Sequence, residues 1–273
     1  YSGTLLPGEI DTVGFDTSSG LGGTSQRYFF TGNFTTIKAY TTSPNSVPDL
    51  QKLNDTATFS FCGALSGVYT INPTGTGASN FVSIQAALDK LNCGGVVGPV
   101  TFNIAPGTYN TQVDITNIAG ASLTNMVEFR SATGVASSVI ITSSNSGANS
   151  NFTLRLLGAQ GLKFTGITFR NTNTTYGRVV SINKLSAQNI NTSDVEFRNC
   201  VLEGLNNQST SDLFSIVFGP TGDNATNLKF VNNQFRFGSY GIYVGGQNII
   251  AQFSNGLVLD SNTFFQNYWA SIY

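Results

Sequence analysis

The segment Asp194–Gly204 reads DVEFRNCVLEG, and its pattern decides the fold because three other segments repeat it. Those segments are Gly161–Asn171 (GLKFTGITFRN), Asn227–Phe237 (NLKFVNNQFRF) and Gly256–Gln266 (GLVLDSNTFFQ). Counted from their second residues, the four segments begin 33, 33 and 29 residues apart. A repeat of this length is typical of stacked solenoids, and the strand-like alternation with no helical stripe indicates β-structure.

The shared pattern predicts which side chains meet inside the fold. Each segment has an apolar residue at offsets +0, +2 and +7 from its second residue. Alternate residues of a strand point to the same side, so we expect like side chains to lie over like in successive coils. The expected stacks are Leu162/Val195/Leu228/Leu257, Phe164/Phe197/Phe230/Leu259 and Phe169/Leu202/Phe235/Phe264.

Offsets +4 and +5 predict how each coil turns. The residues at +4 are Gly166, Asn199, Asn232 and Ser261. Gly and Asn tolerate a left-handed backbone, so we predict a bend of one left-handed residue at this offset. At +5, Asn233 and Asn262 occupy successive repeats, and we expect their side chains to form a hydrogen-bonded ladder along the stack.

The architecture predicted is all-β, a right-handed parallel β-helix. Further β-rich runs between the motifs give each coil three short strands, whereas propeller blades would show regular hairpin turns. One segment, residues 79–92, has helical spacing instead, with Phe81, Ile84 and Leu88 on one face. We expect it to cap the first coil, starting at Ser79 or Asn80 and ending at Gly94–Gly95.

The repeat does not extend over the whole chain, so two domains are predicted. Residues 62–273 are assigned to the β-helix, which we expect to continue beyond residue 273. Residues 1–61 read as antiparallel strands at Glu9–Phe15, Arg27–Phe30, Phe34–Tyr40 and Ala57–Phe61. This segment is similar to the C-terminal part of an immunoglobulin-like β-sandwich, in which an LxPG sequence precedes a strand and an NDT sequence opens the last one.

Composition excludes several classes of function. Only 10% of the residues are charged, the net charge is −1 and the chain has no His. Nucleic-acid binding needs clustered Lys and Arg, so no nucleic-acid partner is predicted. The sequence contains no apolar run long enough for a membrane span. No cofactor is expected, and no metal site, because the Cys and His spacing of a zinc site is missing and the acidic residues are scattered.

The three cysteines divide into a pair and a single residue. Cys62 lies just before a strand and Cys93 just after the helical segment, so a disulfide between them would fix the cap to the first strand. Such a bond fits a secreted or cell-surface location, and the alternative is two buried thiols. Cys200 occupies the interior offset +5 and is interpreted as a small buried apolar residue.

Residues 64–118 carry a resemblance to known families. The stretches are Gly67–Asn72 (GVYTIN), Asn80–Leu88 (NFVSIQAAL) and Gly98–Tyr109 (GPVTFNIAPGTY). They resemble β-helix domains of large secreted surface proteins of Bacteroidota-type bacteria that use type IX secretion. The same residues are similar to the start of pectin methylesterases. Both groups belong to the pectin lyase-like superfamily, so the resemblance implies that fold.

The esterase resemblance weakens at the positions that carry its chemistry. Ile167–Thr172 and Arg178–Ile182 resemble a region in which the family has a Gln that supports an oxyanion, but this chain has Arg178. Phe197–Gly204 resembles the motif before the catalytic acid, yet LNNQS replaces the family's QDTL. Asp212–Ile216 matches the nucleophile motif only loosely. Acid and nucleophile work needs two carboxylates at one cavity, so no catalytic residue is predicted.

Three functions remain open at this point. The first is a noncatalytic β-helix module of a secreted or surface protein, acting in adhesion, surface structure or glycan contact, with extracellular polysaccharide or other surface proteins as partners. The second is a polysaccharide-active enzyme, and the third is a glycan-binding protein like a phage tailspike. The candidate glycan contacts are Tyr240, Tyr243, Tyr268 and Trp269. The alternative for these aromatic residues is packing within loops or against a further coil.

Overall fold

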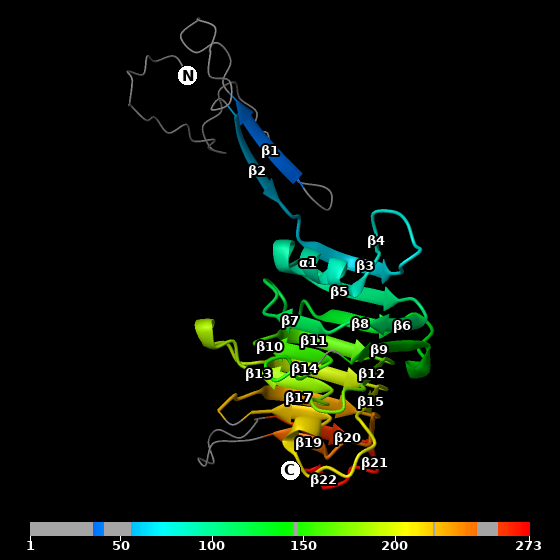
Figure 1. Cartoon of the computed structure of the whole chain (residues 1–273). Helices are drawn as coiled ribbons and strands as arrows, with labels where there is room; N and C mark the ends of the chain where they lie inside the picture. Colours follow the sequence, from blue (N-terminus) through cyan, green and yellow to red (C-terminus); the bar gives the residue numbers. More distant parts are fainter. Residues whose placement is uncertain (1–34, 41–55, 145–146, 221, 245–255) are drawn as a thin grey trace, which may run out of the picture. The chain divides into compact units, whose positions relative to one another are not determined.

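The computed structural model describes residues 35–40, 56–144, 147–220, 222–244 and 256–273 (Figure 1). The chain divides into two compact units, Tyr1–Gly63 and Ala64–Tyr273. In the first unit, β1 (Thr35–Tyr40) pairs antiparallel with β2 (Thr56–Phe61). The predicted strands at Phe34–Tyr40 and Ala57–Phe61 are thus present. The strands predicted at Glu9–Phe15 and Arg27–Phe30 lie outside the described residues, and the immunoglobulin-like assignment stays a prediction.

The second unit is a right-handed parallel β-helix, whose described residues form three parallel sheets. The first sheet has the order β20-β17-β14-β11-β8-β5-β3-β4. Its strands are β3 (Leu65–Ile71), β4 (Asn80–Phe81), β5 (Val96–Ile104), β8 (Val127–Ser131), β11 (Gln160–Thr165), β14 (Ser193–Arg198), β17 (Thr226–Val231) and β20 (Val258–Asp260).

The second and third sheets complete each coil. The second sheet, in order from the last coil, contains β21 (Thr263–Phe265), β18 (Gln234–Arg236), β15 (Val201–Glu203), β12 (Thr168–Asn171), β9 (Val139–Ser143) and β6 (Gly107–Asn110). The third sheet contains β22 (Ala270–Ile272), β19 (Tyr240–Val244), β16 (Val217–Gly219), β13 (Val180–Asn183), β10 (Leu154–Leu157) and β7 (Val113–Thr116). Single 3₁₀ turns lie at Ala136–Ser138, Ser186–Gln188 and Asp212–Phe214. Coils therefore stack strand over strand (Figure 1).

The predicted interior stacks are confirmed by the strand register. Leu162 pairs with Val195 and Phe164 with Phe197, and Phe169 pairs with Leu202 in the second sheet. The Phe197 ring stacks on Phe164 at 4.9 Å and on Phe230 at 5.2 Å between centroids. Aromatic rings repeat at one interior position because every coil offers the same space there, and their burial supplies much of the cohesion between coils.

The predicted turn at offset +4 is also confirmed. Gly166, Asn199, Asn232 and Ser261 all have positive φ, between 54° and 61°. A second left-handed position, not predicted, lies at the first residue of each motif, directly before the first interior side chain: Gly161, Asp194, Asn227 and Gly256 have φ values from 53° to 78°. These two fixed bends bring each motif back into register with the previous coil, so the strand pairs stay aligned despite loops of uneven length.

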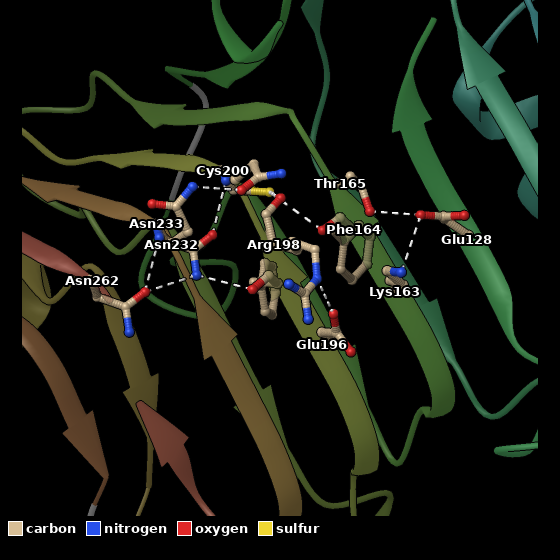
Figure 2. A network of polar contacts seen from close by, with 12 residues as sticks. Glu128, Lys163, Phe164, Thr165, Glu196, Arg198, Cys200, Asn232, Asn233 and Asn262 are labelled. Carbon is tan, nitrogen blue, oxygen red and sulfur yellow. Dashed lines mark hydrogen bonds and ion pairs between the residues drawn. The ribbon is translucent and has the colours of Figure 1, made fainter. Parts of the chain in front are cut away.

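The asparagine ladder predicted at offset +5 is present (Figure 2). The Asn233 side-chain oxygen accepts a hydrogen bond from the Cys200 amide at 2.8 Å, and its amide group donates to the Phe197 carbonyl at 2.9 Å. In the same way, the Asn262 side-chain oxygen accepts a hydrogen bond from the backbone N–H of Asn233 at 2.9 Å. The ladder therefore satisfies backbone groups that the turn leaves unpaired in the interior.

We expect Asn233→Ala to lower the free energy of unfolding by about 1–3 kcal/mol, because it leaves buried backbone groups of Phe197 and Cys200 without partners. Urea denaturation of the variant measures the change. Gln234→Ala is the matched control, since Gln234 is exposed in the adjacent position and should change stability by less than about 0.5 kcal/mol. Equal effects of the two substitutions would contradict the role assigned to the ladder.

The cap helix is present, but its predicted start is wrong. Helix α1 spans Ile84–Gly94, and Ser83 caps it by accepting a hydrogen bond from the Ala86 amide at 3.1 Å. Asn80–Phe81 forms β4 instead, because it pairs with the end of β3. Tertiary pairing overrides the helical spacing here. The predicted end is confirmed by Gly95, which has φ 64°.

The cysteines behave as the sequence predicted. Cys62 and Cys93 form a disulfide, which closes a covalent ring around β3, β4 and α1. Cys200 is a free, buried thiol. Burial raises the pKa of the Cys200 thiol to about 12, so it stays protonated and unreactive near neutral pH.

Candidate functional site

The outer face of the first sheet carries a column of alternating charges. Glu128, Lys163, Glu196 and Lys229 occupy successive strands in register. Lys163 Nζ lies 3.7 Å from Glu128 Oε1, which also accepts a hydrogen bond from the Thr165 hydroxyl at 2.6 Å (Figure 2). The two glutamates are two strands apart, about 10 Å, with a lysine between them. This column therefore holds the two glutamates apart. Glu128 is paired with Lys163 of the column, whereas Glu196 is paired with Arg198 of its own strand.

One small cavity beside this face does bring two carboxylates together, contrary to the expectation that the acids are scattered. Asp194 and Glu196 both line a cavity of about 250 Å³, together with Lys229. Each carboxylate already accepts hydrogen bonds: Asp194 from the Asn227 side chain at 2.9 Å, and Glu196 from Arg198 at 2.6 Å. Both carboxylates at this cavity are therefore already engaged by neighbouring side chains.

A second column of charges lies on the outer face of the second sheet. The column runs through Arg170, Glu203 and Arg236 on adjacent strands. Arg170 Nε is 2.7 Å from one Glu203 oxygen, and Arg236 Nη1 is 3.1 Å from the other. Arg170 and Arg236 therefore share one carboxylate, although both side chains are more than a third exposed. Two guanidinium groups against one carboxylate leave a formal charge of +1 in this cluster.

The larger cavity opens next to Arg170, where the second sheet gives way to the third. Its volume is about 510 Å³, and polar side chains line it throughout. The lining consists of the hydroxyl residues Thr111, Thr142, Ser143, Ser144 and Thr172, the amides Asn110 and Gln112, and the guanidinium of Arg170. We call this cavity the polar hollow. No sequence motif pointed to it, because its walls come from the ends of strands on three successive coils.

The register of the second sheet explains how the polar hollow is built. Asn110 of β6, Thr142 of β9 and Arg170 of β12 lie side by side at the ends of their strands. Gln112 forms one wall and is fixed there, because its amide group donates to the carbonyls of Ser150 and Phe152, both at 2.8 Å. The hollow thus has a rigid floor, with one side chain contributed by each coil about every 4.8 Å.

The four candidate aromatic residues do not form one exposed surface. Tyr240 is only 8% exposed and contacts Tyr243 edge-on at 5.1 Å. Both faces of the Tyr243 ring are covered, by Phe218 at 5.4 Å and Tyr273 at 5.1 Å. Tyr268 and Trp269 are 49% and 59% exposed, and among the described residues neither has a ring contact with the other candidates. Of the four candidate residues, Tyr268 and Trp269 are therefore the two that offer open aromatic surface.

The positions that resemble the esterase site are engaged in structural contacts. Arg178 Nη2 lies 2.5 Å from Asp212 Oδ2. Arg178 stands where the esterase resemblance implied a Gln that supports an oxyanion, and Asp212 begins the segment that loosely resembles the nucleophile motif. The Arg178 guanidinium also lies 3.3 Å from the centre of the Phe218 ring. Burial lowers the pKa of Arg178, and Asp212 opposes this shift. These residues form an ion pair in which the Arg178 side chain is 16% exposed and the Asp212 side chain is 42% exposed, so the Asp212 carboxylate is already engaged.

Two classes of site are missing from the part of the chain that the structure describes. Its His, Cys, Asp and Glu residues include no group of three that could hold a metal ion. No helix among the same residues is long and apolar enough to cross a membrane. The polar hollow offers a ligand hydroxyl, amide and guanidinium groups that can donate or accept hydrogen bonds.

Signals for two of these features were present in the sequence. Arg170, Glu203 and Arg236 all lie at offset +8 of their motifs, so their pairing follows once the coils are aligned. Lys163, Glu196 and Lys229 likewise share offset +1. The hollow had no such signal, since Asn110 and Gln112 belong to a coil that lacks the motif.

Comparison with known proteins yields structural similarity alone. No protein-family model and no curated protein sequence matches this chain. Two solved structures resemble it, both of the pectin methylesterase from Aspergillus niger in deglycosylated forms. They share 16% and 15% sequence identity with the chain over 74% and 75% of its length, with TM-scores of 0.46 and 0.44. The chain spans about 60% of the length of each of those structures.

Proposed function

We propose that this chain is a noncatalytic β-helix module of a secreted or cell-surface protein, and that it contacts glycans. The observation that carries the proposal is the polar hollow, a cavity of about 510 Å³ lined by hydroxyl groups, amides and one arginine. Sugars present many hydroxyl groups, and paired donors and acceptors of this kind hold them by hydrogen bonds. A rigid floor reduces the entropy lost on binding.

The noncatalytic part of the proposal is supported by the carboxylates of the described surface. Glu128, Glu196 and Glu203 each have a cationic partner, and Asp194 accepts hydrogen bonds from neighbouring side chains. General acid–base catalysis needs a side chain that exchanges a proton with the substrate at hydrogen-bond distance, and Asp or Glu often has this role. Each of these three glutamates is instead held by the side chain of a neighbouring Lys or Arg.

The location outside the cell is supported by the disulfide and the composition. Disulfides persist mainly in oxidising compartments, and this chain uses two of its three cysteines in one. The resemblance to β-helix domains of type IX secretion substrates of Bacteroidota-type bacteria is consistent with such a location. A solenoid also offers a long, rigid face suited to extended polymers or to holding neighbouring domains apart.

We expect the full chain to bind a limited set of glycans on an array, without calcium and without releasing methanol or shortened chains from the bound polymer. Thr142→Val should weaken that binding, because it removes a hydroxyl from the floor of the polar hollow while keeping the side-chain shape. Thr108→Val is the matched control, since Thr108 is exposed on the same sheet but does not line the hollow.

The array also separates this proposal from its rivals. Loss of binding in Trp269→Ala, with Thr142→Val unaffected, would move the contact to the exposed aromatic pair. Turnover of the bound polymer would favour the polysaccharide-active enzyme. If the chain binds no glycan on the array, glycan contact is contradicted and a role in surface structure is left.

A further inference from the structure

The positive charge beside the polar hollow indicates which class of glycan would bind there. Arg170, Glu203 and Arg236 form a row in which one carboxylate serves two guanidinium groups. The Glu203 side chain is 15% exposed, whereas those of Arg170 and Arg236 are 36% and 39% exposed. Glu203 is therefore the shielded member, and the uncompensated positive charge faces outward.

Arg170 is the member of this row that reaches the hollow. Its Nε lies close to Glu203 but is not aligned with it as a hydrogen bond, and this buried nitrogen has no hydrogen-bond partner among the described residues. Arg170 thus faces Glu203 with its Nε and also lines the cavity. Arg236 lies on the far side of Glu203 and does not line the cavity.

The remaining walls of the hollow, as far as the described residues form them, contain no charge. Asn110, Thr142 and Thr172 are neutral donors and acceptors, and no carboxylate of the described residues lines the cavity. A ligand that fills it meets one cation among neutral polar groups. The fork of an Arg guanidinium fits the paired oxygens of a carboxylate or a sulfate, and hydrogen bonds to such anions are about twice as strong as neutral ones.

We propose that the polar hollow binds an acidic sugar residue, with the anionic group held by Arg170 and the hydroxyl groups held by the neutral walls. This inference rests on the proposed glycan contact and specifies its ligand class. The site lies at the edge of the second sheet, away from the charged face of the first sheet. The role of Glu203 is to position Arg170, because its carboxylate lies 2.7 Å from the Arg170 Nε and does not itself line the cavity.

The test uses three oligosaccharides of equal length that differ only at carbon 6. They are β-1,4-linked glucuronic acid oligomers, cello-oligosaccharides, and cello-oligosaccharides sulfated at that position. Isothermal titration of the full chain should show that an acidic oligomer binds about tenfold or more tightly than the neutral one. The difference should shrink as the salt concentration rises, because the Arg170 side chain is partly exposed. The preferred acidic oligomer identifies the anion as a carboxylate or a sulfate.

Paired arginine variants assign the effect to one residue. Arg170→Gln should remove the preference for the acidic oligomer while the neutral oligomer binds as before. Arg236→Gln should retain at least half of that preference, although it removes the same charge from the same cluster. Arg170→Lys should restore the preference in part, because it keeps the charge without the fork. Circular dichroism and thermal unfolding of each variant confirm that the fold is intact.

The outcomes distinguish this inference from the function on which it rests. If acidic and neutral oligomers bind equally well, the acidic ligand is wrong while glycan contact stands. An equal loss of preference in both arginine variants would show a diffuse charge effect and would overturn the assignment to Arg170. If none of the oligomers binds and the glycan array is also silent, the proposed function itself fails.

Discussion

Phe197→Ala should lower the free energy of unfolding by about 3–5 kcal/mol, the cost typical of removing a buried phenylalanine ring. Phe197 is 1% exposed, and its ring is stacked on both sides, by Phe164 and Phe230. The Phe169 ring meets it edge-on at 6.2 Å from a neighbouring sheet. Truncation therefore leaves a cavity at the centre of the solenoid and removes the ring against which these three aromatic side chains pack.

Urea denaturation monitored by far-ultraviolet circular dichroism checks this prediction. Phe265→Ala is the control, because Phe265 is 46% exposed on β21 and should cost far less than Phe197. In a solenoid, each coil is stabilised mainly by its neighbours, so we expect the Phe197 variant to unfold in two steps that divide the stack at this coil. A change below about 1 kcal/mol would mean that the aromatic stack is not the main source of cohesion.

Reduction of the disulfide is expected to have the next largest effect. The bond between Cys62 and Cys93 closes a ring of roughly 30 residues, for which the loss of chain entropy in the unfolded state predicts about 3–4 kcal/mol of stabilisation. The Cys62→Ser/Cys93→Ser double variant should therefore unfold at a lower urea concentration than the oxidised protein. Identical midpoints for the two proteins would contradict this account.

Thiol labelling under native conditions provides the internal check. After reduction, Cys62 and Cys93 should react with an alkylating reagent, whereas Cys200 should not. Cys200 is buried in the coil interior, and burial raises the pKa of its thiol to about 12. A third reactive thiol in the folded protein would show that the interior opens on the time scale of labelling.

The interior of this fold was predictable because a solenoid repeats its environment. The 33-residue spacing between Leu162 and Val195 equals the register of their strands, so residues at this spacing in the sequence are neighbours in the structure. The same logic gave the left-handed bend at Asn199 and the ladder at Asn233. Sequence reasoning succeeds here since each prediction depends on residues at equal offsets in adjacent coils.

The predictions were incomplete where the contacts break that regularity. Asn80 and Phe81 have helical spacing with Ile84, but β3 offers them a strand partner, and the helix begins only after Ser83. Tyr240 looked like a surface aromatic, yet Tyr243 and Tyr273 cover it. The polar hollow arises from three strand ends with loops of different lengths, and no fixed offset connects its residues. Such features depend on loop geometry, which the repeat does not encode.

The disulfide also decides how mechanical load enters the β-helix. Tension on the backbone before Cys62 crosses the sulfur bridge to Cys93 and passes on towards β5, because the bridge is the shorter covalent path. The backbone of residues 63–92 then carries no tension, so the pull cannot detach β3, β4 and α1 from the stack while the disulfide is intact. In the reduced protein the same pull acts directly on the start of β3. In the oxidised protein the disulfide therefore transmits the force to the segment after Cys93 without loading β3, β4 and α1.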